Sequence, residues 1–241
     1  AEKPKDPEVL ANLVSRDDPE KPYLGSMGIY LFKTKVLIDI LRQSRGTEHL
    51  DDFGGDIIPY FIKNGSRVFG YNFEGYWRDI GTIRSFYETN LELTTEDAKF
   101  DFYDPDNPIF THPRFLPGSK VMGCMMKDVL LTDGCTIITS QIEHSVIGLR
   151  SQIGSNSKIK DSIIMGADFY GLDKHGAPLG IGQNCDIEGA IIDKNASLGD
   201  GVVIKPFPHD KDVDHALYKV RQGIVVVPKS TTIPAGTIIE P

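Results

Sequence analysis

The chain has 241 residues, and 26 Lys and Arg stand against 34 Asp and Glu, which gives a formal net charge of −8. An acidic chain of this kind is a poor candidate for binding nucleic acid or an anionic membrane through charge. No stretch approaches the roughly 20 apolar residues of a membrane-spanning helix. The length and the 40% hydrophobic share predict a soluble protein of one large domain or two smaller ones.

Helical and extended patterns alternate over the first hundred residues, as they do in an α/β domain. Residues 23–32 and 68–73 are rich in β-branched and aromatic side chains, which predicts two strands. Apolar residues at helical spacing predict helices at residues 35–45, 56–63 and 83–94, with a short one near residues 9–13. Thr82 is expected to cap the helix that begins at Ile83.

Residues 101–117 are rich in proline and aspartate, which predicts a linker. We therefore expect a first domain at residues 1–97, a linker at 98–117 and a second domain at 118–241.

Aliphatic residues recur at six-residue steps in several runs of the second domain, which are Leu131 and Ile137; Ile147, Ile153 and Ile159; Ile181 and Ile187; Ile192, Leu198 and Ile204; and Val227, Ile233 and Ile239. This spacing predicts a β-helix of hexapeptide type, because each flat face of a coil sends one aliphatic side chain inward per six residues. A β-sandwich with accidental spacing is the alternative. Residues 168–177 and 205–218 break the repeat and should form loops that leave the coils.

The three cysteines, Cys124, Cys135 and Cys185, match no disulfide or metal-binding spacing. We expect them to be small, buried thiols in a reducing compartment.

Several blocks occur in a specific order along the whole chain, at residues 1–4, 23–30, 52–59, 75–82, 114–117, 144–151, 165–170 and 190–196. They include Glu-Lys-Pro, Trp-Arg-Asp-Ile-Gly-Thr, Gly-Leu-Arg-Ser and Met-Gly-Ala-Asp. Together they closely resemble glucose-1-phosphate adenylyltransferase of plants and algae, also called ADP-glucose pyrophosphorylase. The resemblance implies a partial Rossmann-like (GT-A type) nucleotidyltransferase domain of α/β class, followed by a left-handed parallel β-helix of hexapeptide repeats.

The resemblance also implies an activity. In this family ATP and α-D-glucose 1-phosphate give ADP-glucose and diphosphate with Mg²⁺, which is the committed step of starch or glycogen synthesis. Control by 3-phosphoglycerate and phosphate, a homo- or heterotetramer of like subunits and a plastid location follow from the same resemblance, with no nucleic acid and no membrane as partners.

The implied catalytic residues are Lys3, which would bind the sugar phosphate, and Asp79, which would ligate Mg²⁺. Glu2 would accept hydrogen bonds from glucose hydroxyls. The remaining substrate-binding positions are Ser26, Met27, Gly28, Asp52, Phe53 and Trp77. For Phe53 and Trp77, packing in the core is an equally reasonable interpretation.

In the second domain the resemblance implies an anionic effector site. Its matched residues are Lys194 and Lys229, with Arg114 from the linker, Asp193 beside Lys194, and Arg221 as a further contributor. Clustered cations suit an anionic effector. The alternative is solvated surface charge.

The family's glycine-rich nucleotide loop, its catalytic basic residue and its other metal carboxylate have no counterpart in this sequence. We therefore expect the C-terminal portion of a longer enzyme, inactive by itself. A non-catalytic regulatory subunit that assembles with an active partner is the second hypothesis. A hexapeptide-repeat acyltransferase is the third, and it would need His144 as its catalytic base.

Overall fold

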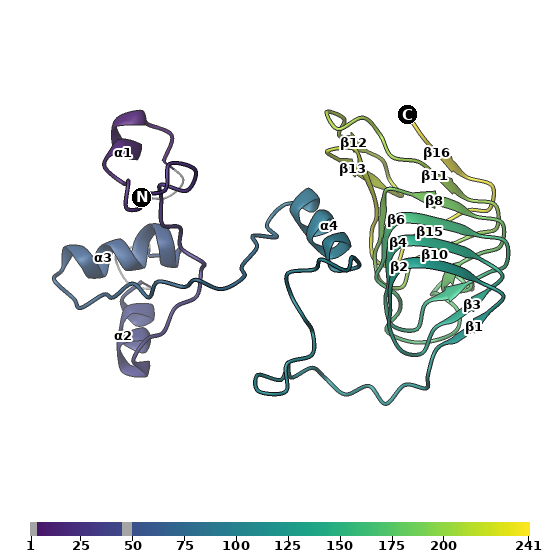
Figure 1. Ribbon diagram of the computed structural model, residues 1–241, viewed down its shortest axis with the longest axis horizontal. Coiled ribbons are helices and arrows are strands. Elements are labelled where there is room, and N and C mark those ends of the chain that lie inside the picture. Colours follow the sequence, from purple (N-terminus) through teal and green to yellow (C-terminus); the bar gives the residue numbers. More distant parts are fainter. Residues whose placement is uncertain (1–3, 45–49) are drawn as a thin grey trace. The chain divides into compact units, whose positions relative to one another are not determined.

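The structure, a computed structural model, describes residues 4–44 and 50–241. It divides into two compact units, Ala1–Trp77 and Arg78–Pro241, which are taken in turn (Figure 1). In the described ranges, no helix is long and apolar enough to cross a membrane.

The described part of the first unit is helical, with α1 (Pro7–Ala11), α2 (Thr34–Ser44), the π-helical turn η1 (Phe53–Ile57) and α3 (Ile58–Lys63). Asp6 begins α1 by accepting a hydrogen bond from the Glu8 amide, as an N-cap residue does. The helices expected near residues 9–13, 35–45 and 56–63 are therefore confirmed, with boundaries shifted by a few residues.

The two strands expected in this unit are wrong. Residues 23–32 and 68–73 form no strand, and they leave Leu31 fully exposed and Tyr71 90% exposed. A strand forms only where a neighbouring backbone completes its hydrogen-bond ladder. Side-chain propensity alone therefore does not make a strand, because it does not supply the neighbouring strand that completes the ladder.

Helix α4 (Ile83–Glu92) belongs to the second unit and begins at Thr82, as the sequence predicts. The Thr82 hydroxyl accepts from the Ser85 amide, and the Ser85 hydroxyl accepts from the Thr82 amide, so both ends of the capping box are formed. One face of the helix packs against the coils through a small apolar cluster of Leu91, Ile163, Ile191 and Ile224.

Sixteen strands lie in the second unit, and all but a short antiparallel hairpin at residues 213–221 belong to coils that are stacked one above another in Figure 1. They are β1 (Lys120–Met122), β2 (Met125–Leu131), β3 (Thr136–Ile138), β4 (Gln141–Ile147), β5 (Gln152–Ile153), β6 (Lys158–Ile164), β7 (Gly180–Ile181), β8 (Asp186–Glu188), β9 (Ala190–Ile192), β10 (Ser197–Leu198), β11 (Val203–Ile204), β12 (Val213–Asp214), β13 (Lys219–Arg221), β14 (Ile224–Val227), β15 (Thr232–Ile233) and β16 (Ile238–Ile239).

Strand pairing gives the coils three faces. The first face is the parallel sheet β1-β3-β5-β7-β10-β15. The second and third share the long strands β2, β4 and β6, which pair with one another in that order. The first half of β6 then pairs with β8 and its second half pairs with β9. These strands turn the corner between the two faces at residues with left-handed backbone, namely Asp128, His144 and Asp161, with φ of 53°, 42° and 45°.

The aliphatic residues of the six-residue repeat point into the coils, and all are at most 5% exposed except Leu131, which is partly buried against the same core; this confirms the β-helix. Coil-to-coil pairing is parallel, so the β-sandwich alternative is excluded. Cys135 and Cys185 are buried as expected, whereas Cys124 is only half-buried, and all three are free thiols. The loops expected at residues 168–177 and 205–218 are present, and the second carries the short strand β12.

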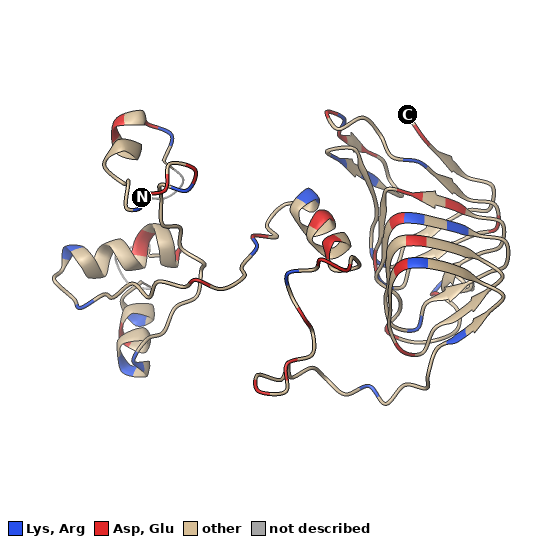
Figure 2. Cartoon of the chain, viewed as in Figure 1, with Lys and Arg blue, Asp and Glu red and all other residues tan. Residues whose placement is uncertain are grey.

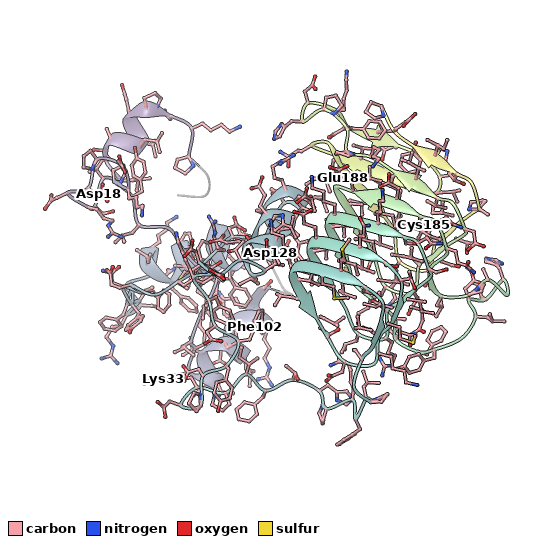
Figure 3. All side chains as sticks on the ribbon, turned by 45° about the vertical axis from the view of Figure 1, so that its right-hand side comes forward. Asp18, Lys33, Phe102, Asp128, Cys185 and Glu188 are labelled. Carbon is pink, nitrogen blue, oxygen red and sulfur yellow. The ribbon has the colours of Figure 1, made fainter. Side chains whose placement is uncertain are left out.

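The outer side of the second face carries a ladder of alternating charge, visible in Figure 2 as blue and red bands on successive strands. Lys127 of β2 contacts Glu143 of β4 at 3.6 Å, and Glu188 of β8, labelled in Figure 3, lies 3.7 Å from Lys160 and 3.4 Å from Lys205. Exposed contacts of this kind stabilise a fold weakly. The buried aliphatic column therefore supplies most of the stability of the coils.

We predict that Ile187→Ala, which empties a fully buried position of the column, lowers the free energy of unfolding by about 2–5 kcal/mol in urea denaturation. Ile238→Ala is the matched control, because Ile238 lies on β16 with 63% of its surface exposed and should cost less than about 0.5 kcal/mol. Equal losses at both positions would contradict the central role of the column.

Candidate functional site

Two tight turns lie at the same edge of the third face of the β-helix, on neighbouring coils. Strands β9 and β14 are parallel neighbours, and the turns at residues 193–196 and 228–231 follow them directly. The third residue of each turn, Asn195 and Ser230, has left-handed backbone, with φ of 60° and 58°. The two turns are therefore equivalent in shape and stacked one coil apart.

Lys194 and Lys229 occupy the second position of these two turns. The Ser230 amide donates to the Lys194 carbonyl at 2.9 Å, which fixes one turn on the other. Neighbouring strands lie about 4.8 Å apart, so the two lysines leave the surface at about that spacing. Two ammonium groups this close repel each other unless an anion lies between them. Lys194 and Lys229 are called the lysine pair below.

Asp168 supplies that anion in the structure. Its Oδ1 lies 3.0 Å from the Lys194 Nζ and its Oδ2 lies 3.1 Å from the Lys229 Nζ. Asn195 holds the aspartate from both sides, because its Nδ2 donates to Oδ2 at 3.0 Å and its Oδ1 accepts from the Asp168 amide at 2.7 Å. Hydrogen bonds from Lys194, Lys229 and Asn195 hold the pKa of the Asp168 carboxyl far below its usual range.

Arg150 lies next to this cluster, and the sequence reasoning gave it no role. Its Nη1 donates to the Ala167 carbonyl at 3.1 Å, directly before Asp168, and its guanidinium lies 5.9 Å from the centre of the Tyr170 ring. Arg150 is the third residue of the turn that follows β4, and like Asn195 and Ser230 it has left-handed backbone, with φ of 60°. Matching the turns of successive coils in the sequence would have placed Arg150 in the same stack of turns as the lysine pair.

Of the other residues expected at the effector site, Asp193 is adjacent to Lys194, whereas Arg221 lies away from the lysine pair. Asp193 accepts a hydrogen bond from the Lys194 amide and so shapes the turn. Arg221 belongs to β13, opposite Ile224 at the start of β14, and contacts Asp214 at 2.7 Å. The lysine pair lies beyond the other end of β14.

Arg114 is exposed in the linker and donates to the His112 carbonyl at 3.1 Å. In the part of the chain that the structure describes, no hydrogen bond or ion pair joins it to the lysine pair. Its role in effector binding stays a prediction.

The first unit gathers part of the expected sugar pocket around one tyrosine. The Ser26 Oγ and the Tyr30 Oη lie 3.3 Å apart, and the Tyr30 ring stacks on Phe53 with 5.8 Å between ring centroids. Asp52 precedes Phe53 and caps η1 by accepting from the Gly55 amide. Ser26, Asp52 and Phe53 therefore lie in one neighbourhood, joined by a tyrosine that the sequence reasoning did not assign.

Met27 and Gly28 follow Ser26 directly in the chain. The Gly28 amide donates to the Ser26 Oγ at 3.2 Å, and its φ of 72° is a conformation that favours glycine. Trp77 is 45% exposed, so it is not a fully buried core residue. Glu2 and Lys3 lie outside the described residues.

Asp79, the expected Mg²⁺ ligand, falls in the second unit. Its Oδ1 accepts from the Gly81 amide at 2.8 Å, which orients the carboxylate ahead of α4. Among the described residues, no group of three or more His, Cys, Asp or Glu side chains could enclose a metal. A lone carboxylate fits Mg²⁺ held mainly by water and phosphate oxygens, which is how this ion is commonly bound.

His144, the residue required by the acyltransferase hypothesis, lies at a corner of β4. Its Nδ1 is 2.6 Å from the Asp161 Oδ1 on the next coil, where Asp161 occupies the equivalent corner. The repeating geometry therefore gives His144 a structural partner in the coil stack.

Comparison with known proteins agrees with this architecture. The family model described as "Nucleotidyl transferase" matches residues 1–96, and the model described as "GLGC left-handed parallel beta-helix domain" matches residues 114–238. The large subunit 1 of glucose-1-phosphate adenylyltransferase, chloroplastic/amyloplastic, of Zea mays is 45% identical over 92% of this chain and 45% of its own length. The small subunit of Triticum aestivum is 41% identical over 99% of this chain and 54% of its own length.

These matches define a nucleotidyl transferase domain joined to a left-handed parallel β-helix. The chain belongs to the glucose-1-phosphate adenylyltransferase family. It spans about half the length of the curated relatives that it matches.

We predict that the Asp168 carboxyl stays ionised well below pH 3.9, the ordinary value for an aspartate, in a ¹³C NMR titration. Because its pKa is lowered in the folded chain, its stabilising contribution is complete above that ordinary value and is lost as the pH falls through the lowered one. In Lys194→Ala the titration should move upward. An unchanged titration would mean that Lys194 does not hold the carboxylate.

Proposed function

We propose that this chain forms the sugar-phosphate-binding and regulatory part of an enzyme that converts ATP and α-D-glucose 1-phosphate into ADP-glucose and diphosphate. The observation that carries this proposal is that both family matches occur in order along one chain, and relatives bearing that enzyme name align with more than nine-tenths of it. The nucleotide-binding half would come from a preceding segment.

The residues of the first unit would position the sugar phosphate for in-line attack on the α-phosphorus of ATP. Lys3 would neutralise the phosphate and Glu2 would accept from the sugar hydroxyls. Asp79 would hold Mg²⁺, which would neutralise charge on the nucleotide phosphates. Such transfers depend mainly on positioning and electrostatic stabilisation, so these contacts would account for most of this chain's contribution to catalysis.

Ser26, Met27, Gly28, Asp52 and Phe53 would line the sugar side of the pocket, with Trp77 supporting Asp79. The contacts from Ser26 through Tyr30 to Phe53 support this grouping.

The lysine pair would bind 3-phosphoglycerate or phosphate. Two ammonium groups on equivalent turns of adjacent coils suit the oxygens of one phosphate, each lysine serving as a point charge. Asp193 would position Lys194. Arg114 and Arg221 remain proposed contributors, which would have to approach from the linker and from the β12–β13 hairpin.

A second candidate is a non-catalytic regulatory subunit that binds effector and assembles with an active partner. It is favoured by one observation: the chain is about equally similar to a large and to a small subunit, 45% and 41% identical. Either role would place the chain in a homo- or heterotetramer, and the chloroplastic/amyloplastic names of its relatives support a plastid location.

We predict that fusing the N-terminal half of the wheat relative to this chain yields diphosphate release that depends on glucose 1-phosphate. In the fusion, Lys3→Ala should raise the KM for the sugar phosphate roughly 10- to 100-fold, as expected when a charge-assisted contact of about 1.5–3 kcal/mol is lost. The KM for ATP should change far less.

Lys5→Ala is the matched control, since Lys5 is an exposed lysine two residues away. An unchanged sugar KM in Lys3→Ala would contradict the assignment of Lys3. A fusion that folds, binds effector and never releases diphosphate would favour the regulatory-subunit candidate.

We also predict that Lys194→Ala in the fusion raises the 3-phosphoglycerate concentration for half-maximal activation about tenfold, because one of two charge-assisted contacts is lost. Lys174→Ala, an exposed lysine of the 168–177 loop, should not. Equal loss of activated and unactivated turnover in Lys194→Ala would mean that the lysine is structural.

A further inference from the structure

We propose that Asp168 acts as a built-in competitor for the anion site of the lysine pair, so that an effector must displace its carboxylate before it can bind. The inference rests on the proposed function of the lysine pair and adds to it the residue that sets the effector concentration needed for occupancy.

The geometry of the carboxylate carries the argument. Oδ1 contacts Lys194 and Oδ2 contacts Lys229, at 3.0 Å and 3.1 Å, so one carboxylate bridges both ammonium groups. Two oxygens of a single phosphate or carboxylate ligand would seek the same two donors. Asp168 and the effector therefore compete for one position rather than occupying neighbouring ones.

The carboxylate is held in this position by contacts that do not involve the lysines. Asn195, only 7% exposed, binds both the amide and the carboxylate of Asp168. Farther along the same loop, the Tyr170 hydroxyl donates to the Gly134 carbonyl at 2.9 Å, and Asp173 accepts from the Thr232 hydroxyl. A competitor anchored in this way remains close to the site after displacement.

The exposure of the three groups permits the exchange. The side chains of Asp168, Lys194 and Lys229 are 41%, 34% and 56% exposed, so water and a small anion reach them without opening the core. Exposed ion pairs are individually weak. Displacing the carboxylate therefore lowers the affinity for the effector by a small but measurable amount. The remaining negative charge would also repel a bound anion at short range.

The test measures binding of inorganic phosphate to the full 241-residue chain by calorimetry at fixed ionic strength. Asp168→Asn keeps the shape of the side chain and its capacity to bond with Asn195 while removing the charge. We expect phosphate to bind about tenfold more tightly than to the wild-type chain. Asp210→Asn, at an exposed aspartate in the 205–218 loop, makes the same change in net charge and should leave the affinity unchanged.

The double variant Asp168→Asn/Lys194→Ala distinguishes competition from a general charge effect, because the gain should disappear when one of the contested donors is removed. Asp168→Ser provides a second neutral replacement if the asparagine variant folds poorly, and it should also bind more tightly. A wild-type affinity that depends on Lys194 but does not change in either neutral variant would overturn the inference and leave the proposed effector site standing. Absence of Lys194-dependent phosphate binding in all chains would overturn both.

Discussion

The column of aliphatic side chains inside the β-helix is the constraint on which the rest of the second unit depends. Each coil contributes residues such as Ile159, Ile187 and Ile204 to one continuous, fully buried stack. Because that burial fixes the register between coils, backbone hydrogen bonds from one coil to the next repeat at equivalent positions. Corners and turns are consequently stacked as accurately as the core itself.

The candidate anion site is a product of this stacking. Lys194 and Lys229 are 35 positions apart in sequence, but their turns follow neighbouring strands and so place two ammonium groups side by side. The fold thereby creates a local concentration of positive charge within a chain whose net charge is −8. Such a pair requires an anion, and in the structure Asp168 provides it.

Much of the second unit could be predicted from the sequence, because a buried aliphatic at every sixth position is a local and repeated signal. The helix cap at Thr82 could also be predicted, because a capping box is contained within four residues. The prediction of strands at residues 23–32 and 68–73 was wrong because strand formation is not a local property. A strand is defined by a partner, and the segment's own side chains carry no information about where that partner is.

The same distinction explains the candidate site. The lysine pair was expected from a motif resemblance, but Asp168 was not, because it enters from a loop that interrupts the repeat and reaches the lysines only when the coils are stacked. Arg221 contacts Asp214 of the β12–β13 hairpin in the structure, and its part in effector binding stays a prediction. Residue type suggested the chemistry, and the register between coils decided which residues meet.

The most direct test of this account is a crystal structure of the chain grown with inorganic phosphate. The account predicts a phosphate within hydrogen-bond distance of both the Lys194 and the Lys229 ammonium groups, with the Asp168 carboxylate no longer bridging them. Phosphate bound at another position, with Asp168 still in contact with both lysines, would contradict it.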